Sequence, residues 1–293
     1  MNILIAGGTG FVGSNLAGKL HENGHNITLL ARPGSKPKIK NAENIPTVET
    51  DFSQTDISIP AKPDVLINCI GIIREFSSKG ITFEKVHYET VRYLIELAKR
   101  NGIGRFLQVS ALGVGPDGKT GYFQTKYKAE ELLKNSDLNI TIFRPSIIYG
   151  PRDEFINMIA GFVKKFSVMP VIGDGKYRLQ PVRVDNLCQV IIKSLGDEFT
   201  SGKTFEIGGP EILTFNEIVD IVGNALGKKV IKLRQPIFIM KILAALFGRF
   251  SWFPVTRDQI IMLYDESYTD DIRLFDRYGI TPRKLQDSLG DYL

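Results

Sequence analysis

Short apolar runs rich in β-branched residues alternate with helical segments along the first two-thirds of the chain. The apolar runs lie at residues 2–6, 26–31, 47–49, 65–69, 105–110 and 141–144. Apolar positions at helical spacing lie within residues 12–23, 83–101 and 122–135. Strands that alternate with helices form a parallel sheet with helices on both faces. The pattern therefore predicts an α/β fold built on a doubly wound parallel sheet.

The alternation changes after Gly150. Helices are predicted at residues 152–166, 186–195 and 216–226, and a short strand at 182–184. We expect this strand and the helix that follows it to return to the main sheet. The rest of the chain indicates a small, discontinuous C-terminal α+β domain. The predicted boundaries are 1–150 plus about 180–208 for the larger domain, and about 151–179 plus 209–293 for the smaller one.

A glycine-rich turn directly follows the first predicted strand and opens the first helix, with the sequence Gly7-Gly8-Thr9-Gly10-Phe11-Val12-Gly13. Its glycines allow a tight turn, a close approach of the main chain to a pyrophosphate, and close packing of helix on strand. The unpaired amides and the positive dipole end of the helix favour phosphate binding there. This order of elements predicts a Rossmann-type dinucleotide site made by Gly7, Thr9, Gly10, Phe11, Val12 and Gly13. The alternative is a glycine-rich turn that serves packing alone.

The end of the second predicted strand bears on which dinucleotide is bound. NAD-selective sites usually place an Asp or Glu there to bind the ribose 2′-hydroxyl, but no acidic residue lies between Glu22 and Glu43. The strand is followed instead by Arg32, Lys36, Lys38 and Lys40. Because a guanidinium binds a 2′-phosphate through paired hydrogen bonds, NADP is predicted and NAD is less favoured. A solvated basic loop is the alternative.

Residues at the ends of the next two strands complete the predicted cofactor site. Asp51, followed by Phe52, comes after the third strand, where its carboxylate can accept a hydrogen bond from the adenine amino group. Asn68 and Gly71 follow the fourth strand, where a glycine lets the main chain pass close beneath a cofactor.

Tyr122 and Lys126 lie four residues apart, on one face of a predicted helix. This spacing is common by chance, but Ser110 ends the preceding strand, so the three side chains can meet. The ammonium of Lys126 is expected to lower the pKa of Tyr122 from its ordinary value of about 10. Tyr122 is then predicted to exchange a proton with a carbonyl or alcohol oxygen that Ser110 holds, while hydride moves at the cofactor. Lys126 would also bind the nicotinamide ribose.

Residues 122–130, YFQTKYKAE, resemble the Tyr-x-x-Ser-Lys-x-x-Ala-Glu pattern of extended short-chain dehydrogenases/reductases, with Thr125 in place of Ser. Further segments look like one atypical branch of that superfamily, the nucleotide-binding accessory subunit of respiratory complex I and its bacterial NAD-dependent epimerase/dehydratase-like relatives. These segments are VLINCIGI (65–72), RFLQVSALG (105–113), FRPSIIYGP (143–151), QPVRV (180–184), FEIGGPEIL (205–213) and TRDQ (256–259). The resemblance covers essentially the whole chain. It implies a Rossmann-type sheet, with Pro145, Ser146 and Ile147 beside the nicotinamide.

The chain departs from the extended pattern at His87, where many members carry an Asn in the helix before Ser110. This weakens a proton relay carried over from the family, and a helix-face histidine satisfied by main chain or solvent is the alternative. The favoured function is an NADP-dependent oxidoreductase or epimerase/dehydratase that uses hydride transfer. The second is a non-catalytic nucleotide-binding accessory or assembly factor of a respiratory or membrane complex. A regulator of transcription is less favoured because Tyr122 is retained.

Composition limits the partners. The chain has 37 Lys and Arg against 32 Asp and Glu, a net charge of +5, and this excess is too small to predict a nucleic-acid partner. Cys69 and Cys188 have no short metal-ligand spacing, so no metal site is predicted. Because an apolar strand begins at Asn2, we expect no signal peptide and predict a cytoplasmic location.

Residues 237–253 are strongly apolar, but the span between Pro236 and Pro254 is too short and too charged for a membrane crossing. An ordinary packed helix is favoured. The alternatives are a substrate lid, a contact with a protein complex, and a peripheral contact with a membrane surface. Apolar residues in this part of the chain favour a small-molecule substrate of lipid-like character over a highly polar sugar.

Overall fold

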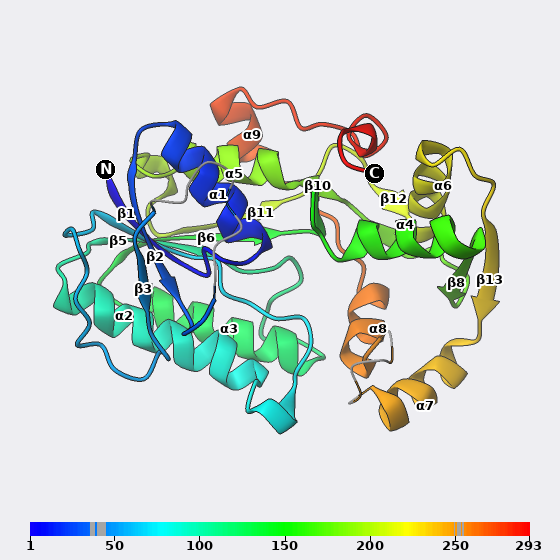
Figure 1. Cartoon of the computed structure of the whole chain (residues 1–293), viewed down its shortest axis with the longest axis horizontal. Coiled ribbons are helices and arrows are strands. Elements are labelled where there is room, and N and C mark those ends of the chain that lie inside the picture. Colours follow the sequence, from blue (N-terminus) through cyan, green and yellow to red (C-terminus); the bar gives the residue numbers. More distant parts are fainter. Residues whose placement is uncertain (36–38, 40–44, 249, 251–252, 254) are drawn as a thin grey trace.

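The computed structural model describes residues 1–35, 39, 45–248, 250, 253 and 255–293 of the chain. Among these residues, seven strands form one sheet in which every neighbouring pair is parallel, in the order β11-β6-β5-β4-β1-β2-β3 (Figure 1). The strands are β1 (Asn2–Ala6), β2 (Asn26–Ala31), β3 (Thr47–Glu49), β4 (Val65–Asn68), β5 (Arg105–Val109), β6 (Asn139–Pro145) and β11 (Lys203–Ile207). The strand order reverses between β1 and β4, and open parallel sheets bind ligands at such a point. The predicted Rossmann-type α/β fold is confirmed.

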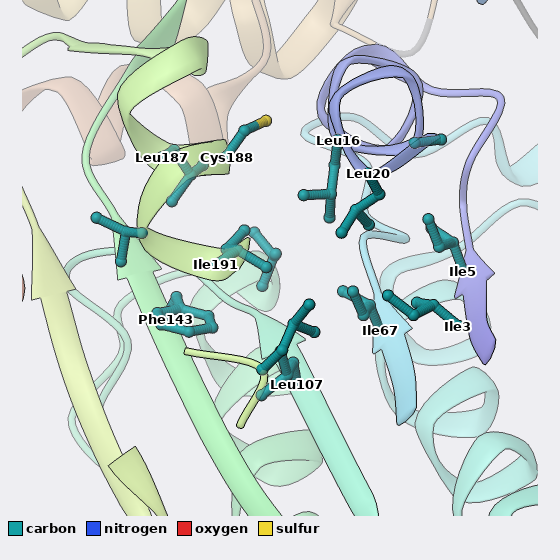
Figure 2. Close-up of a cluster of buried hydrophobic side chains, with 14 of the residues drawn as sticks. Ile3, Ile5, Leu16, Leu20, Ile67, Leu107, Phe143, Leu187, Cys188 and Ile191 are labelled. Carbon is teal, nitrogen blue, oxygen red and sulfur yellow. The ribbon is translucent and has the colours of Figure 1, made fainter. Parts of the chain in front are cut away.

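Helices cover both faces of this sheet. α1 (Phe11–Glu22) and α5 (Val184–Lys193) lie on one face, and α2 (Thr90–Arg100) and α3 (Gly121–Lys134) lie on the other (Figure 1). Figure 2 shows the first of these two layers, in which leucines and isoleucines of α1 and α5 lie against Ile3, Ile5, Ile67, Leu107 and Phe143 of the strands. Strands that are covered on both faces bury successive side chains, which explains their continuous apolar runs.

One strand prediction was wrong. The segment expected to return to the main sheet, β10 (Val182–Arg183), pairs with β7 (Ile148–Tyr149) in a separate two-stranded sheet. The seventh strand of the main sheet is β11, which pairs with β6. β11 buries Phe205 and Ile207 completely, and this apolar burial favours it for the sheet edge. α5 does return to the sheet, where it packs beside α1.

A separate apolar cluster gathers the elements that follow β7. α4 (Phe155–Phe166) and α6 (Phe215–Ala225) pack on β8 (Val168–Ile172), which pairs with β13 (Ile231–Gln235). β9 (Arg178–Leu179) pairs with β12 (Leu213–Thr214). α6 begins with a capping box of Thr214 and Glu217, in which side chain and main chain of the two residues bond reciprocally. The two domain boundaries stay a prediction.

Three further helices are α7 (Ile237–Phe247), α8 (Arg257–Tyr264) and α9 (Arg273–Tyr278). Shorter helical turns are η1 (Ser77–Lys79), η2 (Glu84–Glu89), η3 (Glu198–Thr200) and η4 (Leu289–Asp291). The turn η2 is a π-helix that runs into α2, where the sequence predicted a single helix. Across the described residues, every helix is too short or too polar to cross a bilayer.

Candidate functional site

The glycine turn leaves no room for side chains at two positions. Gly7 has φ +80°, and a Cβ there would lie 2.9 Å from the main-chain nitrogen of Ile70. A Cβ on Gly13 would lie 2.2 Å from the Gly7 oxygen. Gly10 caps α1 without a side-chain hydrogen bond, and Ser14 is the first residue whose amide bonds back, to Gly10 at 3.0 Å. The first amides of α1 are therefore directed at the point where the strand order reverses, as a phosphate site requires.

Arg152 also reaches this turn, although the sequence did not single it out. Its φ is +74°, a left-handed conformation that is costly for a residue with a side chain. From there its guanidinium donates a hydrogen bond of 3.0 Å to the Ser14 hydroxyl in α1. This brings a positive charge to the first turns of α1. No motif in the sequence indicates this contact.

The residues predicted to bind the adenosine half lie beyond β2 and β3. Arg32 is exposed after β2, whereas Lys36, Lys38 and Lys40 lie outside the described residues. The Asp51 carboxylate accepts bonds from the Ser53 amide (2.9 Å) and hydroxyl (2.6 Å), which lower its pKa. Phe52 has φ +61° and packs edge-to-face on Tyr93 with ring centroids 5.5 Å apart. Asp51 and Phe52 thus form a tight, defined turn at the carboxyl edge of the sheet.

At the end of β4, the Asn68 amide nitrogen donates to the Gln108 side chain at 2.9 Å, and its oxygen accepts from the Ile70 amide at 3.0 Å. Gly71 follows, and a Cβ there would lie 3.5 Å from the Lys126 Nζ atom. This places the ammonium against the loop after β4.

The same loop continues to Arg74, whose guanidinium joins it to a distant segment. It donates to the main-chain oxygens of Gly248 (2.8 Å), Phe250 (2.5 Å) and Phe253 (2.8 Å). The loop after β4 is therefore attached to the chain that follows α7.

Tyr122, Lys126 and His87 lie together beneath this loop. Lys126 Nζ is 5.5 Å from the centre of the Tyr122 ring, and the His87 ring meets Tyr122 edge-on at 5.3 Å. His87 Nδ1 is 3.0 Å from the Thr125 hydroxyl, and its Nε2 is 3.1 Å from the Ile72 oxygen. The π-helix η2 carries His87, and such helices are frequent at functional sites. The histidine is thus buried among the site residues, and its Nε2 is satisfied by the Ile72 main chain, as the alternative interpretation of this histidine allowed.

Burial sets the protonation of this group. Burial raises the pKa of Tyr122, and it lowers the pKa of Lys126 to about 8, with the charge of Glu130 opposing that shift. Burial, followed by the charge of Lys126, lowers the pKa of His87 to about 2, against the hydrogen bond to Ile72. The expectation that Lys126 lowers the pKa of Tyr122 was wrong, because desolvation of the buried phenolate raises this pKa. At neutral pH the phenol is therefore protonated and the imidazole is neutral.

Ser110 points to a different partner. Its hydroxyl donates to the Glu130 carboxylate at 2.5 Å, and this buried carboxylate also accepts two bonds from Arg144, at 3.1 and 2.5 Å. None of the hydrogen bonds found among the described residues joins Ser110 to Tyr122. Ser110 and Tyr122 lie near the same sheet edge but do not form one bonded set.

Pro145, Ser146 and Ile147 lie at the end of β6, on the same carboxyl edge of the sheet. The Ser146 amide bonds to the Ile207 oxygen at 2.9 Å, and its hydroxyl donates to the Ser267 oxygen at 2.8 Å. Pro145 and Ile147 each accept a main-chain bond, from Leu112 and Val182 respectively. This segment is held on both sides and forms a fixed wall of the edge.

The sequence and the fold resemble those of known proteins. The sequence model of the NAD dependent epimerase/dehydratase family matches residues 3–208. The chain is 32% identical over 251 residues to subunit 9 of the NADH dehydrogenase (ubiquinone) 1 alpha subcomplex, mitochondrial, of Arabidopsis thaliana, covering 82% of this chain and 62% of that protein. It is 26% identical over 300 residues to the mitochondrial NADH-ubiquinone oxidoreductase 40 kDa subunit of Neurospora crassa, covering 99% of this chain and 78% of that one.

Among solved structures, the UDP-glucose 4-epimerase of Thermus thermophilus in complex with NAD superposes with a TM-score of 0.77. The match has 17% sequence identity and covers 99% of this chain and 97% of the epimerase. This likeness concerns the fold. The plant relative, by contrast, is longer than the chain, which spans 62% of its length.

Proposed function

The chain belongs to the NAD-dependent epimerase/dehydratase family, and from that premise we propose that it is a dinucleotide-dependent oxidoreductase or epimerase/dehydratase with Tyr122 as its proton donor and acceptor. The observation that carries this proposal is the buried group of Tyr122, Lys126 and His87 beside Gly71. This group lies on the carboxyl edge of a sheet whose glycine turn has no space for side chains at Gly7 and Gly13.

The residues of the turn fit a pyridine dinucleotide. Gly7 and Gly13 leave the main chain bare, and the first amides of α1 face the strand reversal. These amides would bind the pyrophosphate, with the Arg152 guanidinium nearby. Thr9, Gly10, Phe11 and Val12 complete the turn. When bound, the dinucleotide supplies or accepts hydride.

The proton chemistry rests on Tyr122. Because burial raises its pKa, the phenol is protonated at neutral pH and can donate a proton to a substrate carbonyl oxygen. The ammonium of Lys126, which lies beside Gly71, would stabilise the phenolate that remains and bind the nicotinamide ribose. The neutral imidazole of His87 holds the Thr125 hydroxyl by a hydrogen bond, and Thr125 lies in α3 between Tyr122 and Lys126. Ser110 as the residue that holds the substrate oxygen stays a prediction, since its hydroxyl is bonded to Glu130.

Replacement of the Tyr122 hydroxyl tests the proposal. In Tyr122→Phe, hydride transfer from bound reduced dinucleotide to a panel of carbonyl compounds should fall at least about 100-fold, while dinucleotide affinity stays the same. Tyr127→Phe, on the next turn of α3, is the matched control and should behave as wild type. Equal rates in wild type and Tyr122→Phe, or no oxidation of bound cofactor with any compound, would refute a catalytic role.

NADP is proposed over NAD because Arg32 occupies the end of β2 and no acidic residue accompanies it there. Arg32→Ala should weaken NADPH binding about tenfold, through the loss of a charge-assisted pair to the 2′-phosphate, and should leave NADH binding unchanged. Arg92→Ala, an exposed arginine on α2, is the control in the same fluorescence titration. Tighter binding of NADH than of NADPH by the wild type would contradict the preference.

The alternative function is a non-catalytic, nucleotide-binding accessory or assembly factor of a respiratory or membrane complex. Two relatives are named as subunits of the mitochondrial NADH dehydrogenase, and Ser110 is bonded away from Tyr122. In that case affinity capture from native lysate should recover a stoichiometric protein complex. Recovery of the chain alone would favour the enzyme, for which we propose an apolar small-molecule substrate. Tight calorimetric binding of a nucleotide-sugar would overturn that substrate class.

A further inference from the structure

Helix α7 has apolar side chains on all sides. The side toward the protein packs with Ile172 and Ile260, through Ile237, Met240, Leu243, Ala244 and Phe247. The opposite side carries Phe238, Ile239, Ile242 and Leu246, which are 63%, 40%, 56% and 59% exposed. A surface helix of a globular protein normally turns polar residues to water. α7 has only one polar residue, Lys241.

The exposed apolar side chains are concentrated in this part of the chain. Of the thirteen large apolar side chains that are exposed among the described residues, seven lie between Ile231 and Phe250. Figure 1 shows α7 at the edge of the molecule, away from the central sheet. Single exposed apolar residues are normal, whereas a contiguous group marks a surface that contacts something else. We call the surface formed by Phe238, Ile239, Ile242 and Leu246 the α7 face.

The stretch of chain that carries the α7 face has charges of one sign. No Asp or Glu occurs between Asp220 and Asp258, while the same stretch contains Lys228, Lys229, Lys232, Arg234, Lys241, Arg249 and Arg257. Lys229, Arg234 and Lys241 are exposed. Lys232 pairs with Asp220 at 2.6 Å. In an apolar helix flanked by basic residues, the apolar side chains can enter the acyl region of a bilayer and the basic side chains can bind anionic lipid headgroups.

We propose that the α7 face lies in the plane of an anionic lipid bilayer surface, with Phe238, Ile242 and Leu246 among the upper acyl chains and Lys241 at the headgroups. The spacing of these three apolar residues, four apart, puts them in one row along the helix. With 11 residues, α7 is too short to cross the bilayer and instead lies along it. This contact does not depend on the chemistry proposed for Tyr122.

Vesicle flotation with the full chain, without nucleotide, tests the proposal. The protein should float with vesicles of phosphatidylglycerol and phosphatidylcholine and bind pure phosphatidylcholine at least about tenfold more weakly. Raising the salt concentration from about 0.1 to about 1 M should weaken binding to the anionic vesicles, because salt screens the attraction between the basic residues and the headgroups.

Two sets of variants distinguish binding through the α7 face from nonspecific adsorption through any exposed apolar residue. Ile242→Ser with Leu246→Ser should lower the partition coefficient by about tenfold or more, since two large side chains no longer enter the acyl region. The matched control is Ile272→Ser with Ile212→Ser, two isoleucines that are 58% and 42% exposed elsewhere, and it should bind as wild type. Because all four side chains are exposed, the thermal midpoints should agree. Lys241→Gln tests the charge and should also weaken binding to anionic vesicles.

The proposal is overturned if the wild type does not float, if it binds neutral and anionic vesicles equally, or if the Ile242 and Leu246 variant binds as well as wild type. Self-association in the absence of vesicles that this same variant abolishes would assign the face to a second copy of the chain. A failure of any of these tests leaves the Tyr122 experiment unaffected, because none of them measures nucleotide or turnover.

Discussion

Acidification should destabilise this fold through His87. The ring is 3% exposed, and burial together with the charge of Lys126 lowers its pKa from 6.5 to about 2. The unfolded chain therefore binds a proton at this histidine below pH 6.5, while the folded chain does not. Stability from this group is fully present above pH 6.5 and is lost progressively as pH falls toward 2.

The loss can be estimated from the linkage relation. The pKa of this histidine in the unfolded chain is 6.5. A fall from about pH 7 to about pH 5 therefore takes the unfolded chain about 1.5 pH units below that pKa. At about 1.36 kcal/mol per unit, His87 alone should lower the free energy of unfolding by about 2 kcal/mol. The groups found around the ring are Lys126, Tyr122, Thr125, Phe83 and the main chain of Ile72, and none of them supplies an acidic group that would hold the imidazolium.

Urea unfolding followed by circular dichroism at about pH 7 and pH 5 measures this loss. Wild type should lose about 2 kcal/mol more than His87→Gln between the two pH values, whatever the absolute stability of the variant. His21→Gln, which alters a surface histidine on α1, should lose as much as wild type. A difference between wild type and His87→Gln below about 0.5 kcal/mol would show that the imidazole is protonated in the fold and would refute the reasoning.

Two further predictions concern the glycine turn and a buried ion pair. Gly13→Ala places a Cβ 2.2 Å from a main-chain oxygen of the turn and should weaken dinucleotide binding at least about 100-fold, whereas Gly18→Ala, with its nearest contact at 3.5 Å, should bind normally in the same titration. Glu130→Gln removes the carboxylate that holds Arg144 and should lower the free energy of unfolding by about 3 kcal/mol. Its neighbour Glu131→Gln, whose carboxylate is exposed, should change the free energy by less than about 0.5 kcal/mol, and equal losses in both would contradict the buried-pair argument.

The glycine turn and the parallel sheet were predictable because their causes are local. Gly13 is required by contacts with Gly7 and Gly8 in the same turn, the positive φ of Gly7 belongs to that turn, and continuous apolar runs identify strands covered on both faces. β11 was missed because Lys203 and Glu206 interrupt its apolar residues, as suits a strand at the sheet edge. A periodicity search for a buried strand does not find such a pattern.

Side-chain direction at the site could not be predicted from the sequence. The Ser110 hydroxyl turns to Glu130 because α3 and β6 bring a carboxylate and Arg144 to it from 20 and 34 residues along the chain. His87 is placed by a π-helix, whose wider turn shifts the side chains that follow it. The balance between burial and charge that fixes the pKa of Tyr122 depends on the same three-dimensional neighbours.

The attachment made by Arg74 has a consequence for how this protein can vary. All three of its acceptors are carbonyl oxygens of the peptide backbone, which every amino acid possesses. The identity of the side chain at each of these three positions therefore does not affect the acceptor it provides, provided the path of the chain is kept, although Phe253 is also buried in an apolar cluster with Ala244 and Ile260. At position 74 the guanidinium itself is required, because a lysine there would lack the planar fork that serves three oxygens at once.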